Sequence, residues 1–118
     1  MDRDRAVALA HEWIDAWNAH DPERVVVHFA EDVVVRSPMA AQVRPDSGGI
    51  LEGKDAVLSY YRDGLAASGA LHFTLIEVCT GIDEVVIVYR NHRDVIVTER
   101  LVVDDAGVAR EVSVAYAG

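Results

Sequence analysis

The stretch "HFAEDVVVRSP", residues 28–38, decides where the first strand of the fold runs and where it ends. Its three consecutive valines carry branched side chains, which favour extended backbone. Pro38 cannot donate a hydrogen bond to a neighbouring strand, so the pattern predicts a strand over residues 32–37. The strand therefore ends at Ser37, and the pattern leaves open whether its hydroxyl faces water, a packed core or a ligand.

Two helices are predicted before this strand. Apolar residues, among them Trp13, Ile14 and Trp17, recur at three- and four-residue spacing and predict a helix over residues 4–19. The next segment, "HDPER", places an aspartate directly before a proline, which is typical of the start of a helix. It predicts a short second helix over residues 22–29.

A loop, a third helix and four more strands are predicted after the first strand. Residues 38–52 hold two prolines and a Gly-Gly pair and predict a long loop of the kind that borders functional sites. Residues 54–67 carry an apolar stripe that includes Tyr61 and predict a helix. The rest of the chain holds four strand-like segments separated by short turns, which predicts antiparallel neighbours: "ALHFTLIEVCT", "DEVVIVYRN", "DVIVTERLVV" and "GVAREVSVAY".

The length, composition and net charge of the sequence restrict the class of protein. The 118 residues, of which 51% are hydrophobic, fit a single domain over residues 1–118. Apolar runs are too short for a membrane span and the first residues lack the apolar stretch of a signal peptide, so we expect a cytoplasmic protein. The net charge of −9 repels phosphates and anionic lipids, which argues against nucleic-acid and membrane partners.

Cys79 is the only cysteine of the chain. A single cysteine excludes an internal disulfide and gives no support to a thiolate metal cluster. Its neighbours, "IEVCTG", are typical of the end of a strand, so we expect a buried and unreactive thiol.

The order of these elements indicates an α+β fold in which helices cover one face of an antiparallel sheet. The segments "VVIVY" and "VIV" are apolar on both faces of their strands. That pattern indicates a sheet that is covered on both sides, by helices on one and by a second subunit on the other. We therefore expect a homodimer.

Four segments follow one another over essentially the whole chain in a familiar order: "WIDAWNAHDPERVVVHFAEDVVVRSP", "GKDAVLSYYRDGL", "VVIVYRN" and "TERLVVDDAGV". Together they resemble the nuclear transport factor 2-like superfamily, in its SnoaL-like branch. The resemblance implies a cone-shaped α+β half-barrel, in which three N-terminal helices pack on a curved, mostly antiparallel sheet in the order α-α-β-α-β-β-β-β. It also implies an apolar pocket at the open end. The branch includes ketosteroid isomerases, polyketide cyclases, dehydratases, epoxide hydrolases and non-catalytic binders, so membership does not fix the function.

The alternation of side chains along strands indicates which residues would face such a pocket. If Tyr89 faces inward, Glu99 on the next strand faces inward as well. The helices would add aromatic side chains, and the loop would place a methionine near the mouth. The residues predicted to bind a small apolar molecule are Trp13, Trp17, Ser37, Met39, Tyr61, Tyr89 and Tyr116.

Glu99 is the candidate catalytic residue. A carboxylate between Val97 and Leu101 on an inward face is costly to ionise, so its pKa should rise. The neutral acid could then act as a general acid or donate a hydrogen bond to a ligand oxygen. The alternatives are a strand in the other register, or a structural ion pair of Glu99 with Arg90 or Arg110.

Ketosteroid isomerase is the sharpest comparison within the resemblance. Its general-base aspartate would fall on Ser37, its oxyanion-hole tyrosine on Trp13, its protonated second aspartate on Glu99 and its supporting tyrosine on Tyr61. A serine without a partner base cannot take a proton from carbon, so enone isomerisation by that route is not expected.

Neither a metal site nor a cofactor is predicted. His11 and Glu12 lack the second histidine of a zinc-binding helix, because position 15 is Asp, and no Gly-rich phosphate loop follows a strand. Two functions of different classes stay open. One is an isomerase, cyclase, dehydratase or hydrolase that acts on a small apolar molecule through Glu99; the other is a non-catalytic ligand-sensing or dimerisation module.

Overall fold

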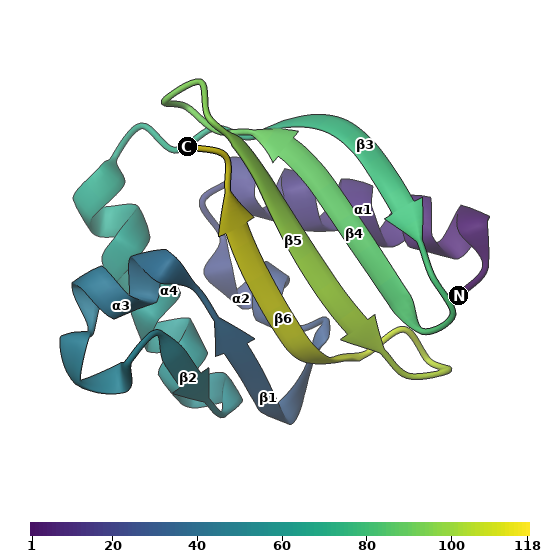
Figure 1. Cartoon of the computed structure of the whole chain (residues 1–118), viewed down its shortest axis with the longest axis horizontal. Coiled ribbons are helices and arrows are strands. Elements are labelled where there is room, and N and C mark those ends of the chain that lie inside the picture. Colours follow the sequence, from purple (N-terminus) through teal and green to yellow (C-terminus); the bar gives the residue numbers. More distant parts are fainter.

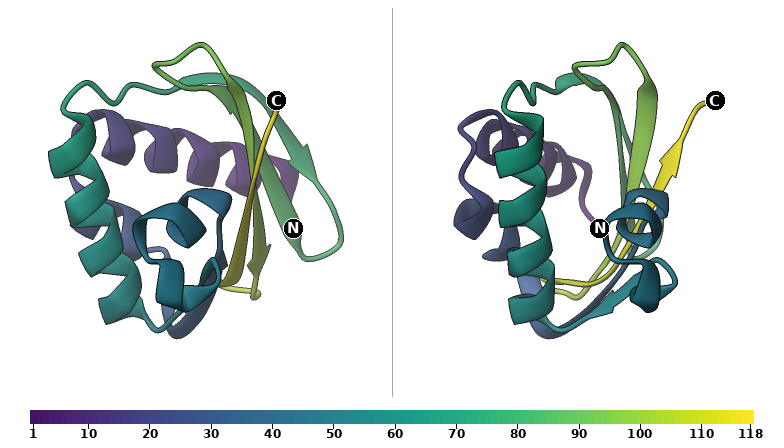
Figure 2. Two further views of the ribbon diagram at one scale, coloured as in Figure 1. Left: turned by 60° about the vertical axis from the view of Figure 1, so that its left-hand side comes forward. Right: turned by 90° about the vertical axis from the view of Figure 1, so that its left-hand side faces the viewer.

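A computed structural model describes residues 1–118, the whole chain, as helices packed on one curved sheet (Figure 1). Figure 2 shows α1, α2 and α4 together on one side of that sheet. The elements in chain order are α1 (Arg3–Asn18), α2 (Pro22–Val26), β1 (Phe29–Arg36), α3 (Pro38–Val43), the 3-10 turn η1 (Pro45–Ser47), β2 (Ile50–Glu52), α4 (Lys54–Ser68), β3 (Thr74–Thr80), β4 (Glu84–Arg90), β5 (Ile96–Val103) and β6 (Ala109–Tyr116).

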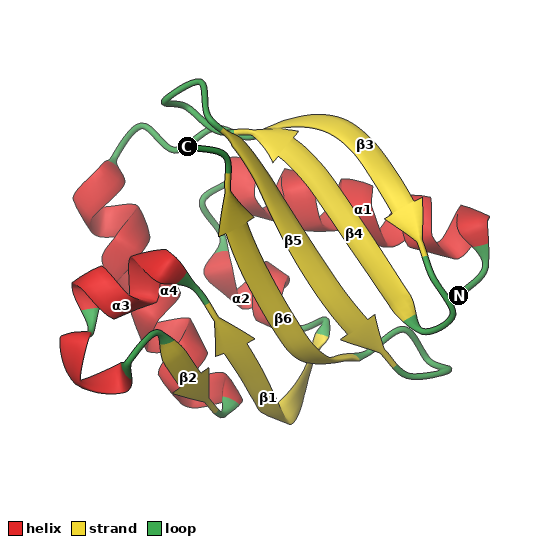
Figure 3. Ribbon diagram, viewed as in Figure 1, coloured by secondary structure: helices red, strands yellow, loops and turns green.

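The six strands form one sheet in the order β2-β1-β6-β5-β4-β3 (Figure 3). All neighbours are antiparallel except β1 and β6, which run parallel. The register shifts within the β1·β6, β3·β4 and β5·β6 pairs, and such irregularities bend strands and increase their twist. The bent sheet leaves a concave inner face on the side of the helices (Figure 2).

Helix α1 begins and packs as its sequence pattern predicts. The carboxylate of Asp2 caps the helix by accepting a hydrogen bond from the backbone N–H of Asp4. The apolar stripe of the helix, which includes Trp13 and Trp17, is buried. Because α1 crosses behind β3, β4 and β5, this stripe forms one wall of the core (Figure 1).

The inner faces of β4, β5 and β6 supply the opposite wall. Val85, Ile87 and Tyr89 alternate with half-exposed neighbours along β4 and are all buried. The same alternation buries Glu99 on β5 and Val112 on β6. The predicted fold class, the antiparallel order of the last four strands and the inward direction of these residues are therefore confirmed.

The predicted long loop over residues 38–52 is wrong in its detail. Pro38 occupies the first turn of α3, where its missing N–H leaves no hydrogen bond unmade, so the proline starts a helix as well as ending a strand. The chain then reverses at Gly48, which has a φ of 64°, and Ile50–Glu52 returns to pair with β1. The segment thus adds a short helix and an edge strand to the predicted order.

The prediction that Cys79 is buried is also wrong. Cys79 is exposed, because Val78 takes the inward position on β3 and the alternation turns its neighbour outward. In addition, β3 is an edge strand that pairs only with β4, so it is covered less than a central strand. As for membranes, the helices include none with the length and apolar character that crossing one requires.

Candidate functional site

Glu99 lies near the middle of β5, between the buried side chains of Val97 and Leu101. Only 6% of the residue is exposed, although it is ionisable. The phenol of Tyr89, on the neighbouring strand, donates a hydrogen bond of 3.0 Å to Oε1 of Glu99. No group of the protein pairs with Oε2. The alternative that Glu99 forms an ion pair with Arg90 or Arg110 is therefore wrong. Arg90 pairs with Asp94, and Arg110 pairs with Asp83.

Burial raises the pKa of Glu99 to about 8, because the ionised carboxylate loses its hydration. The hydrogen bond from Tyr89 lowers the pKa but does not offset this effect. Glu99 is therefore protonated at neutral pH. A neutral carboxylic acid in an apolar interior can donate a hydrogen bond or deliver a proton, which an ordinary surface glutamate cannot do at this pH.

Five aromatic residues, Trp13, Trp17, Tyr61, Phe73 and Tyr89, form an aromatic cluster next to Glu99. Its ring centroids lie at contact distance: Trp13 is 5.6 Å from Tyr89, Trp17 is 4.6 Å from Tyr61, and Phe73 is 4.3 Å from Tyr89. The cluster joins α1 and α4 to the sheet and keeps water from Glu99.

The tyrosines around Glu99 stay protonated. Burial raises the pKa of Tyr61 and Tyr89, and the negative charge that Glu99 would carry raises both further. Their hydroxyls are therefore hydrogen-bond donors at any physiological pH.

Ser37 lies at the outer edge of this region, where β1 ends. Its backbone N–H donates to the carbonyl of Gly49, but its side chain does not cap α3, although Ser37 is the residue before that helix. Burial raises the pKa of Tyr60, and it raises the pKa of Tyr116 to about 12; the hydroxyl of Ser37 lowers both pKa values in part.

A depression of about 310 Å³ opens beside Ser37, and it lies where β1 leaves the sheet while β6 continues. Val114 is part of its wall and is the direct cross-strand partner of Glu99. The depression therefore lies one residue away from the buried acid, with apolar, hydroxyl and guanidinium groups around it. Its lining residues are Arg36, Ser37, Pro38, Ala41, Gly48, Gly49, Ile50 and Val114.

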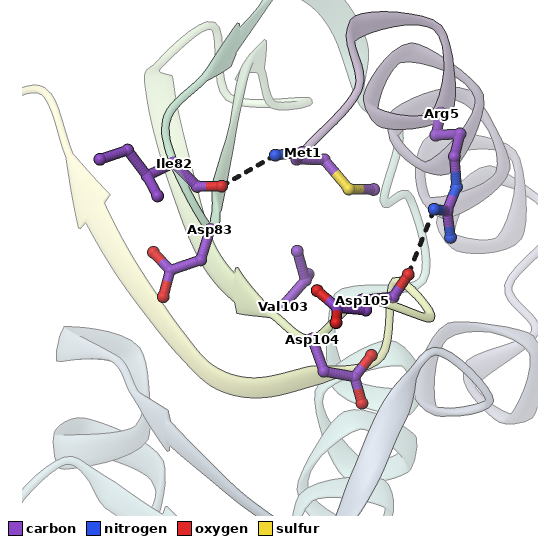
Figure 4. Close-up of a pocket in the computed structure, with 7 residues that line it drawn as sticks. All are labelled: Met1, Arg5, Ile82, Asp83, Val103, Asp104 and Asp105. Carbon is purple, nitrogen blue, oxygen red and sulfur yellow. Dashed lines mark hydrogen bonds between the residues drawn. The ribbon is translucent and has the colours of Figure 1, made fainter.

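A smaller depression of about 110 Å³ lies at the other end of the molecule, beside the N-terminus (Figure 4). Its walls are acidic, with Asp83, Asp104 and Asp105 among the lining residues. The terminal ammonium donates to the carbonyl of Ile82, and Arg5 donates to the carbonyl of Asp105. These contacts hold α1 against two turns of the sheet. We therefore assign a structural role to the residues of this depression. No three histidine, cysteine, aspartate or glutamate side chains of the chain are grouped to hold a metal ion.

The structure brings most of the predicted site residues together. Tyr89 bonds Glu99, Trp13 contacts Tyr89, and Trp17 contacts Tyr61 in the same buried core. Ser37 lies at the edge, and Met39 packs half-buried on the core from α3. Tyr116, at the end of β6, is 38% exposed. The function of all these residues stays a prediction.

Tyr60 and Phe73 were missed as site residues. Tyr60 is buried near Ser37. Burial raises the pKa of Tyr60, and the negative charge that Glu99 would carry raises it further. The position of Tyr60 next to Tyr61 was the sequence feature that could have identified it. Neighbours on a helix lie about 100° apart and can both face a broad concave surface. Phe73 lies just before β3 and gave no such signal.

Residues 10–116 match the family model described as SnoaL-like domain. The chain belongs to the SnoaL-like family. A solved SnoaL-like protein of unknown function from Burkholderia thailandensis is 33% identical and has a TM-score of 0.93, with 99% of this chain and 98% of that chain covered. A search of curated proteins finds no match.

Two further solved structures share the fold at low identity. One is a protein from Kribbella flavida whose description proposes a ketosteroid isomerase, with 16% identity, a TM-score of 0.72, and coverage of 98% of this chain and 79% of that chain. The other is SalBIII, described as an epoxide hydrolase/cyclase-like enzyme in pyran ring formation in polyether salinomycin. It is 15% identical with a TM-score of 0.75, and the match covers 98% of this chain and 93% of that chain. The SnoaL-like fold thus hosts proteins described with different chemistries.

Proposed function

We propose that this SnoaL-like domain binds a small apolar molecule in the interior of its half-barrel and that Glu99 acts on that molecule as a protonated acid. The observation that carries the proposal is the state of Glu99: it is buried, its pKa is raised to about 8, and its Oε2 has no partner in the protein. Buried polar atoms in folded proteins nearly always have a partner, so this atom fits a role toward a ligand.

The residues fit a reaction in which Glu99 donates a proton to the substrate better than one in which a base removes a proton from it. Glu99 holds a proton at neutral pH and can give it to a substrate oxygen, while Ser37 has no carboxylate or histidine that would make it a base. Proton transfer to an oxygen assists cyclisation, epoxide or ester hydrolysis, and dehydration. The solved structures with this fold include descriptions of both kinds, an epoxide hydrolase/cyclase-like enzyme and a ketosteroid isomerase, so the preference rests on the residues of this chain.

A non-catalytic module is the second candidate, and one observation favours it. The aromatic cluster occupies much of the interior, and Glu99 lines neither the depression beside Ser37 nor the depression beside the N-terminus. Entry of a ligand therefore requires side chains at the mouth, such as Tyr116, to move. If they never move, the interior is a packed core.

We also propose that a second copy of the chain covers the outer face of the sheet. The residues of β4 and β5 that alternate with the buried ones include Val86, Val88 and Thr98, which are only half-buried in one chain. Light scattering should give the mass of a dimer, and Val88→Lys should give a monomer; a monomeric wild-type protein would contradict this part. The small apolar ligand, the absence of nucleic-acid partners and the cytoplasmic location stay predictions.

The proposed function is tested by recording backbone amide spectra during titration with a panel of small apolar molecules. We expect shifts to centre on Glu99, Val114 and Tyr89. A panel compound that shows turnover should lose it in Glu99→Gln, which keeps the shape but cannot deliver a proton. Shifts confined to the outer face of the sheet, or no shift with any compound, would contradict the proposal.

A further inference from the structure

Arg36 differs from nearly all the other basic residues of the chain. Of the eleven lysine and arginine residues, eight form ion pairs with an aspartate or glutamate, and Arg5 donates to the carbonyl of Asp105. Arg36 and Arg93 are the two that remain. Arg93 lies in the exposed turn between β4 and β5, whereas Arg36 lines the depression beside Ser37. In a chain with twenty acidic residues, a guanidinium that pairs with none of them is free to bind another anion.

The depression around Arg36 carries no negative charge of its own. The residues directly opposite Arg36 are Ile50 on β2 and Ser113 on β6, and none of the lining residues is an aspartate or glutamate. Glu52 and Glu111 lie two positions further along these neighbouring strands, and neither forms an ion pair with Arg36. An anion in the depression therefore meets a positive wall.

The sheet leaves one strand position vacant next to the depression. Strand β1 pairs with β6 as far as Arg36, opposite Ser113, and then leaves the sheet, while β6 continues to Tyr116 (Figure 1). The N–H of Ala117 donates to the carbonyl of Ile96 on the other side, and the direction of backbone groups alternates along a strand. The N–H of Tyr116 therefore faces the vacant side and offers a further donor there.

The remaining walls suit a small apolar body. Pro38 and Ala41 of α3, Ile50 of β2 and Val114 of β6 are apolar. Ser37, of which only 6% is exposed, adds a hydroxyl group. The volume of about 310 Å³ lies at the lower end of the range for small-molecule sites, so it suits a single ring with a short polar group.

We infer that the depression binds a small monocarboxylate with a compact apolar body, and that Arg36 selects the carboxylate. A carboxylate is ionised at neutral pH and offers two oxygens, which a guanidinium can hold by two parallel hydrogen bonds. The ring of the ligand would lie against Pro38 and Ile50. The inference goes beyond the proposed function, because the depression is open at the surface, is not lined by Glu99 and requires no ligand in the interior.

Cyclohexanecarboxylate and cyclohexanecarboxamide test the inference, because they share a ring and differ in charge. Their affinities are measured at low ionic strength from the backbone amide resonances of four lining residues: Ala41, Gly48, Gly49 and Val114. We expect the carboxylate to bind about fivefold more tightly than the carboxamide, which is the size of effect that a solvent-exposed ion pair supports. The preference should shrink at about 1 M salt, since salt screens exposed charges. Acetate, which has the charge but no ring, should bind more weakly than cyclohexanecarboxylate.

Variants separate the charge from the space. Arg36→Gln should lower the affinity for the carboxylate to that for the carboxamide and leave the carboxamide unaffected. Arg93→Gln removes the other arginine without an ion pair and is the matched control, with both affinities unchanged. Ala41→Leu should fill the depression from α3 and weaken both ligands, whereas Ala56→Leu, at an exposed position of α4, should weaken neither. All four positions are exposed, so these variants should fold.

Equal affinities of the wild-type protein for the carboxylate and the carboxamide would overturn the inference. A carboxylate affinity that survives Arg36→Gln, or that falls equally in Arg93→Gln, would overturn it as well. The proposed function depends on different signals, since uncharged apolar molecules that shift Glu99 and Tyr89 support it whatever happens at Arg36. The two ideas therefore fail on different results.

Discussion

The burial of Glu99 should make the stability of the folded protein fall as the pH rises. The pKa of Glu99 is raised from a usual value of 4.5 to about 8 in the folded state. Between these values the folded chain holds a proton that the unfolded chain has lost, so every unit of pH weakens the fold. Below pH 4.5 the residue contributes its full stability, and above pH 8 that contribution is gone.

The size of the effect follows from the pKa difference. One pKa unit corresponds to about 1.36 kcal/mol, so the ionisation of Glu99 should cost the folded state about 5 kcal/mol between pH 4.5 and 8. That is a large part of the total of about 5–15 kcal/mol that stabilises a typical domain. A stability change of this size is measurable by urea unfolding followed through tryptophan fluorescence.

The comparison with Glu99→Gln isolates this residue from the other acids. Gln keeps the shape and the hydrogen bond from Tyr89 but does not titrate. The difference in free energy of unfolding between variant and wild type should grow in favour of the variant by about 5 kcal/mol from pH 4.5 to pH 9. Parallel curves for the two proteins would show that Glu99 ionises freely, and the reasoning would be refuted.

Three further substitutions have defined outcomes. Tyr89→Phe removes the only hydrogen bond to the carboxyl group of Glu99, so the pKa of Glu99 should rise further in a carboxyl titration and urea unfolding should show a loss of about 1–2 kcal/mol; an unchanged pKa would contradict this. Gly49→Ala places a Cβ 3.1 Å from the carbonyl oxygen of Ser37 at a φ of 87°, so thermal unfolding should show a loss of about 1–2 kcal/mol, and a neutral result would contradict the close approach. Tyr116→Ala removes a half-exposed ring from the mouth, so ligand association in stopped flow should become faster while stability changes by less than about 1 kcal/mol; an unchanged rate would place the entry elsewhere.

The parts of the fold that repeat with a short period could be predicted from the sequence. The two-residue period of "VVIVY" and "TERLVV" placed Tyr89 and Glu99 on one face of the sheet, but it left the register open, because "VVIVY" is apolar on both faces; the structure turns that face inward. The spacing of Trp13 and Trp17 did fix the buried face of α1.

Contacts between distant segments could not be predicted. The parallel pairing of β1 with β6 joins residues far apart in the chain, and no local pattern encodes it. The exposure of Cys79 depends on β3 being an edge strand, which is a property of the whole sheet. The missing partners of Trp13, Trp17 and Glu99 likewise appear only when the whole interior is assembled.

The direct measurement of the central claim is a titration of the side-chain carboxyl carbon of Glu99 by NMR, with Glu99→Gln used to assign the signal. A buried neutral acid predicts a midpoint near pH 8, well separated from the other carboxyl groups. A midpoint near 4.5 would mean that water reaches Glu99, and the buried acid on which the proposed function depends would not exist.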